Sequence, residues 1–332
     1  MNNSDAIALS LFETLTLEPA SAPLRLQLKE TEWSYSKRNT AEQCLRKLYF
    51  EYYGSAMGKA KAEPKKDLLR FLKRLQNRHE RVGAIAHLVI ANYFRKAQEG
   101  QILELSRLTS WARRIFSADI SCSMAKHPAA ASTNEKFPPV QLLEFYYNQA
   151  GAADLCAEAE RKMVTALETF CSSSRYEKIR VAGQRHAAQI EHHFRLKSLA
   201  CRVVGVVDFA LKTKEVPGIV DWKTCSRTAG QDDSLQLAVY AMWGAEHFGC
   251  PAESVEVFKA FLGSGDLVRY RTTSNSLQKA QKRILQDAER LAAVHPYGIE
   301  GRMAAFTACA QPKICALCPY VAACPEGKEC VL

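Results

Sequence analysis

The chain has 332 residues, of which 47% are hydrophobic, and its formal net charge at pH 7 is +10. This composition excludes an intrinsically disordered chain and allows a large buried core. The positive charge favours a polyanionic partner, either nucleic acid or acidic lipid, without choosing between them.

The first twenty residues contain no basic region followed by an apolar stretch, so a secretory signal is not predicted. No apolar run approaches the length of a membrane span. Twelve cysteines in such a chain argue against disulfides, because a reducing cytoplasm keeps thiols free. We therefore expect a cytoplasmic protein without a membrane partner, in which some cysteines bind a metal ion or a cluster.

The first half of the sequence is predicted to be mainly helical. Residues 1–30 lack a strong period and are expected to form a short strand or strap. Apolar residues recur at helical spacing from Ser36 onward, and further helices are predicted at 82–97, at about 102–117 and at 140–173. The stretch 126–139 contains three prolines and is predicted to be a loop.

A basic stretch lies within this helical half. Residues 59–81 contain nine Lys or Arg and three acidic residues, and their later part, 65–81, has the leucine spacing of an amphipathic helix. Such a helix could follow a phosphate backbone, or it could be a solvated helix face. The candidate nucleic acid contacts are Lys65, Lys66, Arg70, Lys73 and Arg74.

The second half changes to strands. β-Branched runs predict strands at 186–197, 201–212 and 218–224, followed by a helix at 232–248, a strand at 255–262 and a helix at 275–293. This order predicts an α/β core preceded by a helical insertion. The expected segments are a strap and helix at 1–58, a helical lobe at 59–180, the core at 181–300 and a cysteine-rich segment at 301–332.

Acidic residues lie on two of the predicted strands. Asp208 is expected at the end of one strand, and Asp221 and Lys223 share a face of the next because strand side chains alternate. Two carboxylates beside an ammonium group are costly to place together unless they bind something. Mg²⁺ or Mn²⁺ would provide a reason, since both ions prefer oxygen ligands, and the lysine could then orient an attacking water.

Other polar residues could join this cluster. Gln236 and Tyr240, four residues apart on a predicted helix, share a face and could reach the same edge, although they could also be ordinary polar positions. His87 could bind the metal ion or a phosphate, or it could be a hydrogen-bonded core histidine. Glu191, on the preceding strand, could add a carboxylate or be solvated.

The C-terminal cysteines have the spacing of a metal site. Cys315, Cys318 and Cys324 follow the pattern C-x2-C-x5-C, and a closed site requires a fourth ligand. Cys309 and Cys330 are local candidates, and Cys44 is a distant one. Spacing alone favours structural zinc bound by Cys309 and the three others, but it does not decide between zinc and an iron–sulfur cluster.

Taken together, these residues resemble the PD-(D/E)XK nuclease superfamily. More narrowly, the chain looks like the RecB-like exonuclease branch with an iron–sulfur cluster, which includes CRISPR-associated exonucleases and the AddB nuclease domain. The matching stretches are "SYSKRNTAEQCLRKLYFEYY", "GAIAHLVI", "VVGVVDF", "VDWKT", "QLAVY" and the three cysteines of the C-x2-C-x5-C pattern, Cys315, Cys318 and Cys324. The resemblance implies a restriction-endonuclease-like core, with a mixed central sheet flanked by helices, a helical insertion and an iron–sulfur module.

The resemblance also implies roles for the residues. Cys44 would join Cys315, Cys318 and Cys324 around a 4Fe-4S cluster that links the N- and C-terminal segments. The Mg²⁺ or Mn²⁺ ligands would be His87, Asp208 and Asp221, with Lys223, Gln236 and Tyr240 completing the catalytic set.

The implied activity is that of a metal-dependent DNA nuclease, an exonuclease on single strands or DNA ends, in DNA repair, phage defence or CRISPR-type processing. One alternative is a non-catalytic or partner-activated DNA-binding subunit of a helicase, defence or adaptation complex, which makes a helicase or defence-complex protein a further candidate partner. A second alternative is a zinc-stabilised regulatory protein.

Overall fold

The computed structural model describes residues 31–55, 64–125, 137–213, 216–228, 234–294 and 303–331. The strap predicted at 1–30 and most of the loop predicted at 126–139 lie outside the described residues. The chain divides into two compact units. Unit 1 comprises Met1–Lys66, Arg195–Val204 and Gln281–Leu332, and unit 2 comprises Asp67–Phe194 and Gly205–Ala280.

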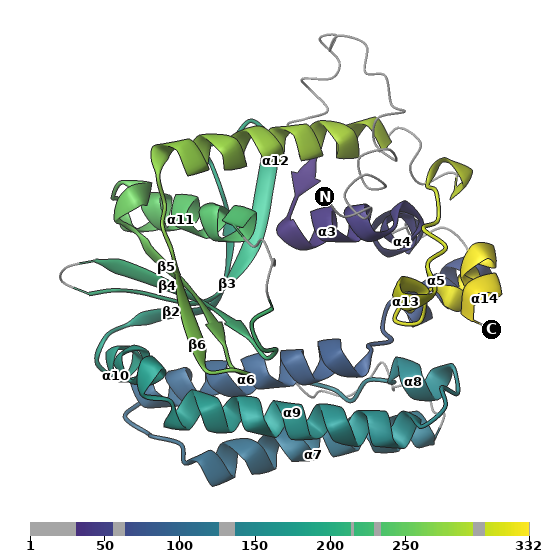
Figure 1. Cartoon of the computed structure of the whole chain (residues 1–332), viewed down its shortest axis with the longest axis horizontal. Coiled ribbons are helices and arrows are strands. Elements are labelled where there is room, and N and C mark those ends of the chain that lie inside the picture. The colour runs from purple at the N-terminus through teal and green to yellow at the C-terminus, as the bar shows by residue number, and fades with distance from the viewer. Residues whose placement is uncertain are drawn as a thin grey trace. The chain divides into compact units, whose positions relative to one another are not determined.

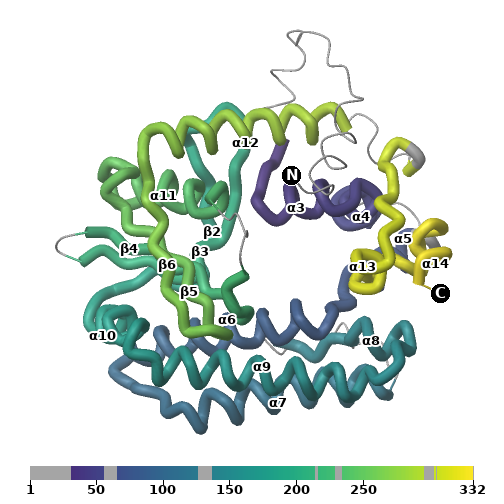
Figure 2. Tube along the Cα trace, in the orientation of Figure 1, coloured from purple at the N-terminus to yellow at the C-terminus, as the bar shows by residue number. Residues whose placement is uncertain are grey.

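Helices form much of unit 2. They are α6 (Arg78–Gln98), α7 (Leu105–Met124), α8 (Leu143–Tyr146), α9 (Ala152–Ser172), η2 (Ser174–Tyr176), α10 (Glu177–Arg185), α11 (Ser234–Phe248) and η3 (Ala252–Ser254). Two helices, α5 (Pro64–Leu72) and α12 (Ser274–Val294), cross the boundary between the units. Figure 2 shows α6, α7 and α9 lying side by side, and these three helices contact one another.

Two predicted helices are divided. The basic helix expected at 65–81 ends at Leu72, and α6 begins at Arg78, where the Asn77 side chain accepts hydrogen bonds from the His79 and Glu80 N–H groups, each at 3.0 Å. The helix expected at 140–173 is divided into α8 and α9, and Gly151 precedes α9 with a φ of +68°. Apolar periodicity thus predicts one continuous helix in each of these regions, whereas local capping residues divide each into two.

The sheet of unit 2 is mixed (Figure 1). Its strands are β2 (Ala188–Arg195), β3 (Arg202–Lys212), β4 (Pro217–Lys223), β5 (Glu256–Phe261) and β6 (Asp266–Tyr270). The order is β3-β4-β5-β6, with β2 also paired to β3. The β3–β4 and β5–β6 pairs are antiparallel, and the β4–β5 pair is parallel. The predicted mixed α/β core with flanking helices is therefore confirmed, whereas α10 and β6 were not predicted.

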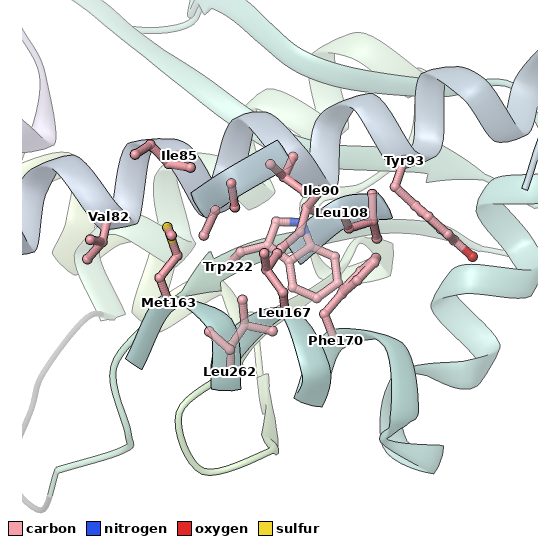
Figure 3. Packing of buried hydrophobic residues seen from close by; sticks show 14 of the residues in the cluster. Val82, Ile85, Ile90, Tyr93, Leu108, Met163, Leu167, Phe170, Trp222 and Leu262 are labelled. Atoms are coloured by element: carbon pink, nitrogen blue, oxygen red, sulfur yellow. The ribbon is translucent and has the colours of Figure 1, made fainter. Parts of the chain in front are cut away.

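The main hydrophobic core lies between one face of this sheet and the helices α6, α7 and α9. Trp222 of β4 is 1% exposed, and its ring lies 5.4 Å from that of Phe170 and 5.9 Å from that of Tyr176. Figure 3 shows this indole among side chains such as Ile90 and Leu167. Since strand side chains alternate, burial of Trp222 directs its neighbours Asp221 and Lys223 to the opposite face.

Helix α11 contacts β4 and β5. A Cβ added at Gly244 would lie 2.8 Å from a Val255 methyl group and 3.0 Å from one of Ile219, so only glycine allows this close approach. Because Ile219 and Asp221 share a face of β4, the helix that packs on Ile219 also faces Asp221.

Unit 1 is assembled from segments that are distant in sequence. It contains β1 (Glu32–Trp33), α3 (Tyr35–Gln43), α4 (Leu45–Leu48), a π-helical turn η1 (Tyr49–Gly54), η5 (Met303–Ala305), α13 (Pro312–Cys315), η6 (Val321–Ala323) and α14 (Pro325–Val331). Strand β1 pairs in parallel with Arg202 and Val203. The helix predicted from Ser36 is interrupted at Cys44, which is extended, with φ −166° and ψ 115°.

The N-terminal and C-terminal segments of unit 1 are joined through Arg46. Its Nε donates to the Phe306 carbonyl oxygen at 2.7 Å, and its two terminal nitrogens contact the two Glu326 carboxylate oxygens at 3.1 Å. The Phe306 ring packs 5.0 Å from Tyr49 and 5.6 Å from Tyr53. This join combines a bidentate ion pair with aromatic packing.

Within the described ranges, no helix combines the length and the apolar character that crossing a membrane requires.

Candidate active site

The two candidate carboxylates lie on neighbouring antiparallel strands. The β3–β4 ladder runs from Lys212–Pro217 to Phe209–Val220, and Asp208 and Asp221 are the next residues along each strand. Asp208 lies within β3, so the prediction that it ends a strand was wrong. One of its carboxylate oxygens accepts a hydrogen bond from the Trp222 N–H at 2.9 Å, which fixes this side chain against β4.

Asp221 is the centre of a hydrogen-bonded network. Its carboxylate, 2% exposed, lies 2.9 Å from the Lys223 ammonium group. Gln236 Nε2 donates to Asp221 Oδ1 at 3.2 Å and to the Tyr240 hydroxyl at 2.9 Å. The Tyr240 hydroxyl is in turn 3.2 Å from Asp221 Oδ1 and 3.1 Å from the Val206 carbonyl oxygen. Because a hydroxyl has one proton, it donates a hydrogen bond to one of these two oxygens at a time. The structure thus brings these predicted residues together.

His87 joins the cluster from α6. Its Nδ1 lies 3.4 Å from Asp208 Oδ1. The His87 and Lys223 side chains are 29% and 28% exposed, so a ligand could reach both, whereas Asp221 lies beneath them. The cluster is therefore open on one side and closed by protein on the other.

The two carboxyl groups have opposite pKa shifts. Burial raises the pKa of Asp221, and the neighbouring Asp208 charge adds to this shift, although Lys223 opposes it. Burial also acts to raise the pKa of Asp208, but the His87 and Lys223 cations outweigh it, and that pKa is lowered. Closely spaced buried carboxyl groups with separated pKa values are typical of functional sites.

His87 and Tyr240 also respond to these carboxylates. Burial acts to lower the pKa of His87, but Asp208 more than offsets it, so the pKa of His87 is raised. Burial, followed by the charge of Asp221, raises the pKa of Tyr240 well above its ordinary value. Tyr240 therefore keeps its proton and remains a hydrogen-bond donor.

Glu191 is engaged elsewhere. Its Oε2 forms an ion pair with Arg95 Nη2 at 2.7 Å, and Arg95 lies eight residues beyond His87 on α6, which corresponds to about 12 Å along the helix. Glu191 also has a φ of +48°, which is uncommon for a residue other than glycine. No contact in the described part of the chain joins Glu191 to Asp208 or Asp221.

The predicted basic residues differ in exposure. Lys66 is buried, whereas Arg70, Lys73 and Arg74 are exposed, and Arg70 forms an exposed ion pair with Asp67 at 3.3 Å. Lys65 lies within α5, but its side chain is outside what the structure describes. The basic stretch is thus not one continuous cationic face.

A residue that the sequence did not single out lies beneath the site. Lys259 of β5 is paired directly with Asp221 in the β4–β5 register, is 2% exposed, and contributes attraction to the Asp221 carboxylate. The signal in the sequence is a lysine inside the apolar strand "VEVFKAFL". Its proximity to Asp221 depends on strand register, which periodicity alone does not give.

Several cysteines of unit 1 surround one small cavity. Its lining includes the four residues predicted as cluster ligands and one more: Cys44, Cys315, Cys318, Cys324 and Cys309. The extended backbone at Cys44 both interrupts the helix and caps α4, because the Lys47 N–H donates to Cys44 Sγ at 3.4 Å.

Burial disfavours the thiolate form of four of these cysteines. It raises the pKa of Cys309 to about 12 and that of Cys318 to about 11. Burial also raises the pKa values of Cys315 and Cys324. A bound metal would have to displace these protons.

In the ranges that the structure describes, no group of three or more His, Cys, Asp or Glu side chains is arranged to hold a metal ion.

Comparison with known proteins identifies a family. The model described as the PD-(D/E)XK nuclease superfamily matches residues 32–325. No curated protein matches the chain.

Two solved structures are similar to it at low sequence identity. The crystal structure of a "Putative exonuclease" from Eubacterium rectale has 14% sequence identity and a TM-score of 0.41, covering 88% of this chain and 90% of that chain. The crystal structure of SSO0001 has 14% identity and a TM-score of 0.27, covering 55% of this chain and 79% of that chain. Neither likeness adds to what the family model gives.

Proposed function

Because the chain belongs to the PD-(D/E)XK nuclease superfamily, we propose that it is a metal-dependent DNA nuclease that acts as an exonuclease on single strands or DNA ends. The observation that carries this proposal is the convergence on Asp221 of Lys223, Gln236 and Tyr240, beside Asp208. A buried carboxylate held by several donors, open on the side of a lysine, suits the hydrolysis of a phosphodiester.

The two carboxylates are of the ligand type that suits a divalent cation, although the described side chains are not arranged around one in this structure. We propose Asp208, Asp221 and His87 as its ligands, since carboxylate oxygens suit Mg²⁺ and Mn²⁺. Asp221 Oδ2 is buried and accepts no hydrogen bond of good geometry in the structure, although the Lys223 ammonium group is nearby. A cation bound there supplies Lewis acidity and lowers the pKa of a bound water.

The protein's own groups would orient the reactants. The partly exposed Lys223 ammonium is placed to hold the attacking water and to stabilise charge on the phosphate oxygens. Gln236 and Tyr240 occupy one oxygen of Asp221, which fixes the rotamer of that carboxylate. Neither is an anionic ligand, so we assign them positioning roles.

We also propose that Cys44, Cys315, Cys318 and Cys324 bind a 4Fe-4S cluster. Thiolates are the usual ligands of such clusters, and these four residues line the same cavity, which supports the assignment. The cluster would stabilise unit 1, because it would connect residues separated by more than 250 positions in the chain.

The charge of +10 supports nucleic acid as the substrate, and the exposed Arg70, Lys73 and Arg74 are candidate backbone contacts.

The test is digestion of end-labelled single- and double-stranded DNA with Mg²⁺ or Mn²⁺. We expect the wild type to degrade DNA and Asp221→Asn and Lys223→Ala to be inactive. Asp154→Asn, an exposed carboxylate at the start of α9, is the matched control and should retain full activity. Cleavage by all variants alike would show that Asp221 and Lys223 are not the catalytic groups.

A pure wild type that binds DNA but cleaves none with either metal ion would favour the alternative, a DNA-binding subunit that a helicase or a defence-complex protein activates.

A further inference from the structure

A cleft of about 680 Å³ opens in unit 2 beside the end of β4. Thr224, which directly follows Lys223, forms part of its lining, so the cleft begins one residue from the candidate active site. Its other polar walls come from α6, from one face of α9 and from the loop after β4. They include His79, Arg161, Lys162, Thr165 and Ser226.

One face of α6 leads from the active site into this cleft. His79, Gly83 and His87 are spaced at intervals of four residues and therefore lie along the same side of the helix. Eight residues of helix correspond to about 12 Å, which spans roughly three to four stacked nucleotides at 3.4 Å each. His87 marks the active-site end of this path, and His79 marks the cleft end.

Gly83 lies in the middle of this face of α6. Glycine inside a helix costs roughly 0.5–1 kcal/mol relative to alanine, so its presence needs a reason. Packing does not supply one, because an added Cβ would meet only Thr224 Oγ1, at an ordinary 3.7 Å. Gly83 is instead the point at which this face of α6 comes nearest to the loop that follows the catalytic strand.

The charged side chains that line the cleft carry a net positive charge, with Arg161 and Lys162 against Glu158. Arg161 is exposed and forms no hydrogen bond or ion pair within the described ranges. Lys162 pairs with Glu158, which also lines the cleft, at 2.6 Å, so that pair is locally neutral. Arg161 is thus the side chain best placed to contact an anionic ligand.

The loop that borders the cleft is fixed to the sheet. Leu262 N–H donates to the Lys223 carbonyl oxygen at 2.7 Å, and Gly263 N–H donates to that of Cys225 at 3.2 Å. A Cβ at Gly263 would lie 2.7 Å from the Ser226 nitrogen, which shows how closely the two segments pack. The cleft therefore has a fixed relation to Lys223.

We infer that this cleft binds the nucleotides of the substrate strand that adjoin the scissile phosphate, with Arg161 contacting a backbone phosphate and the strand lying along the Gly83 face of α6. The inference rests on the proposed nuclease function. The volume is that of a site for a small ligand and suits a few nucleotides of one strand rather than a duplex.

The test compares a long substrate with a minimal one. Arg161→Ala should raise KM for a labelled single-stranded oligonucleotide roughly tenfold, and should reduce the slope of log KM against log salt by about 0.7, the value for one phosphate contact on a single strand. Hydrolysis of bis(p-nitrophenyl) phosphate, which is too short to reach the cleft when its phosphate lies in the active site, should not change. Lys178→Ala, an exposed cation on α10 outside the cleft, is the control and should match the wild type.

A second pair of variants tests the path itself. Gly83→Leu should slow cleavage of the oligonucleotide while leaving the minimal ester unaffected, whereas Gly83→Ala should behave as the wild type because its Cβ has room. Unchanged oligonucleotide kinetics and salt slope in both Arg161→Ala and Gly83→Leu would overturn the inference.

Failure of the proposed nuclease function can be distinguished from failure of the cleft inference. A wild type that hydrolyses neither substrate would refute the nuclease assignment, and fluorescence anisotropy of the uncleaved oligonucleotide would then decide the cleft alone. Weaker binding by Arg161→Ala would support the cleft, and equal binding would overturn it.

Discussion

The acidic site of unit 2 and the cysteine cavity of unit 1 are both clusters of groups that bind cations, but they are held together differently. Around Asp221, strands and a regular helix supply the donors, and each side chain contacts another member of the cluster. Around the cavity, the thiols lie on short helices and irregular segments, and their polar contacts are long. Examples are Cys324 Sγ to Glu326 Oε2 and Lys47 N to Cys44 Sγ, each at 3.4 Å.

The difference indicates what each region needs. The acidic site is organised by its own hydrogen bonds and is preorganised for chemistry. The cysteine cavity is lined by buried and partly buried thiols, four of which have pKa values raised by burial, and its organisation would be completed by the group they bind. Variants of the first region should therefore lose activity without losing stability, and variants of the second should do the reverse.

The sharpest test is Asp221→Asn. We expect cleavage to fall by roughly 10³-fold or more, because the substitution removes an anion from the centre of the site. The melting temperature should not fall, since burial already disfavours the Asp221 charge. Nuclease assays and thermal melts on the same preparation check this, and a large drop in melting temperature would make Asp221 a structural residue.

Cys318→Ser should have the opposite effect. Loss of one ligand should remove iron, measured by metal analysis and visible absorbance, and lower the melting temperature of the protein as isolated. The control is Cys250→Ala, at a partly buried cysteine of unit 2, which should keep the iron content and the melting temperature of the wild type. A colourless wild type containing stoichiometric zinc would contradict the cluster assignment.

Arg46→Met tests the join between the segments of unit 1. It removes the hydrogen bond to the Phe306 carbonyl oxygen and should cost about 1.5–3 kcal/mol of unfolding free energy. The matched control is Arg113→Met, whose contact with Glu160 is 3.5 Å long and exposed, and which should cost less than about 0.5 kcal/mol. Equal effects in urea denaturation would show that Arg46 does not hold the segments together.

Tyr240→Phe should reduce kcat by about tenfold, because Asp221 loses one of the groups that orient it. Tyr93→Phe removes a buried hydroxyl that accepts from Gln184, away from the site, and should leave kcat unchanged. The comparison is of kcat at saturating substrate. Similar losses in both variants would point to a general effect on the core.

The smallest expected effect is on pH dependence. The pKa of His87 is raised above 6.5 in the folded protein, because Asp208 outweighs the effect of burial. Its stabilising contribution is therefore fully present below pH 6.5 and is lost as pH rises through the folded pKa. In metal-free protein, the stability difference between wild type and His87→Gln should shrink from pH 6 to pH 8, and a growing difference would contradict this sign.

Much of the acidic site could be predicted because its determinants are local. Strand alternation places Asp221 and Lys223 on one face, and helical spacing places Gln236 and Tyr240 together. The partners of Glu191 and Lys259 could not be predicted, because they depend on an unusual backbone angle in one case and on strand register in the other.

The same reasoning explains the differences in fold. The long helices α6, α7 and α12 have clear apolar periods and were predicted, and α11 was predicted from a continuous apolar stretch. The break before α6 depends on Asn77 capping, and the break at Cys44 depends on an extended residue within a helical pattern. Neither break interrupts the spacing of the apolar side chains. Periodicity therefore predicts a continuous helix at each of these two positions.

The discontinuous composition of unit 1 has a consequence for the order in which the protein is made. Its first segment emerges from the ribosome long before Phe306 and Glu326, the residues that Arg46 contacts. Most residues of unit 2 are synthesised in between, and their core can begin to condense as a unit. Until Phe306 is synthesised, the Tyr49 and Tyr53 rings lack the partner that they pack against in the folded protein. We therefore expect chaperones to bind this early segment of the nascent chain.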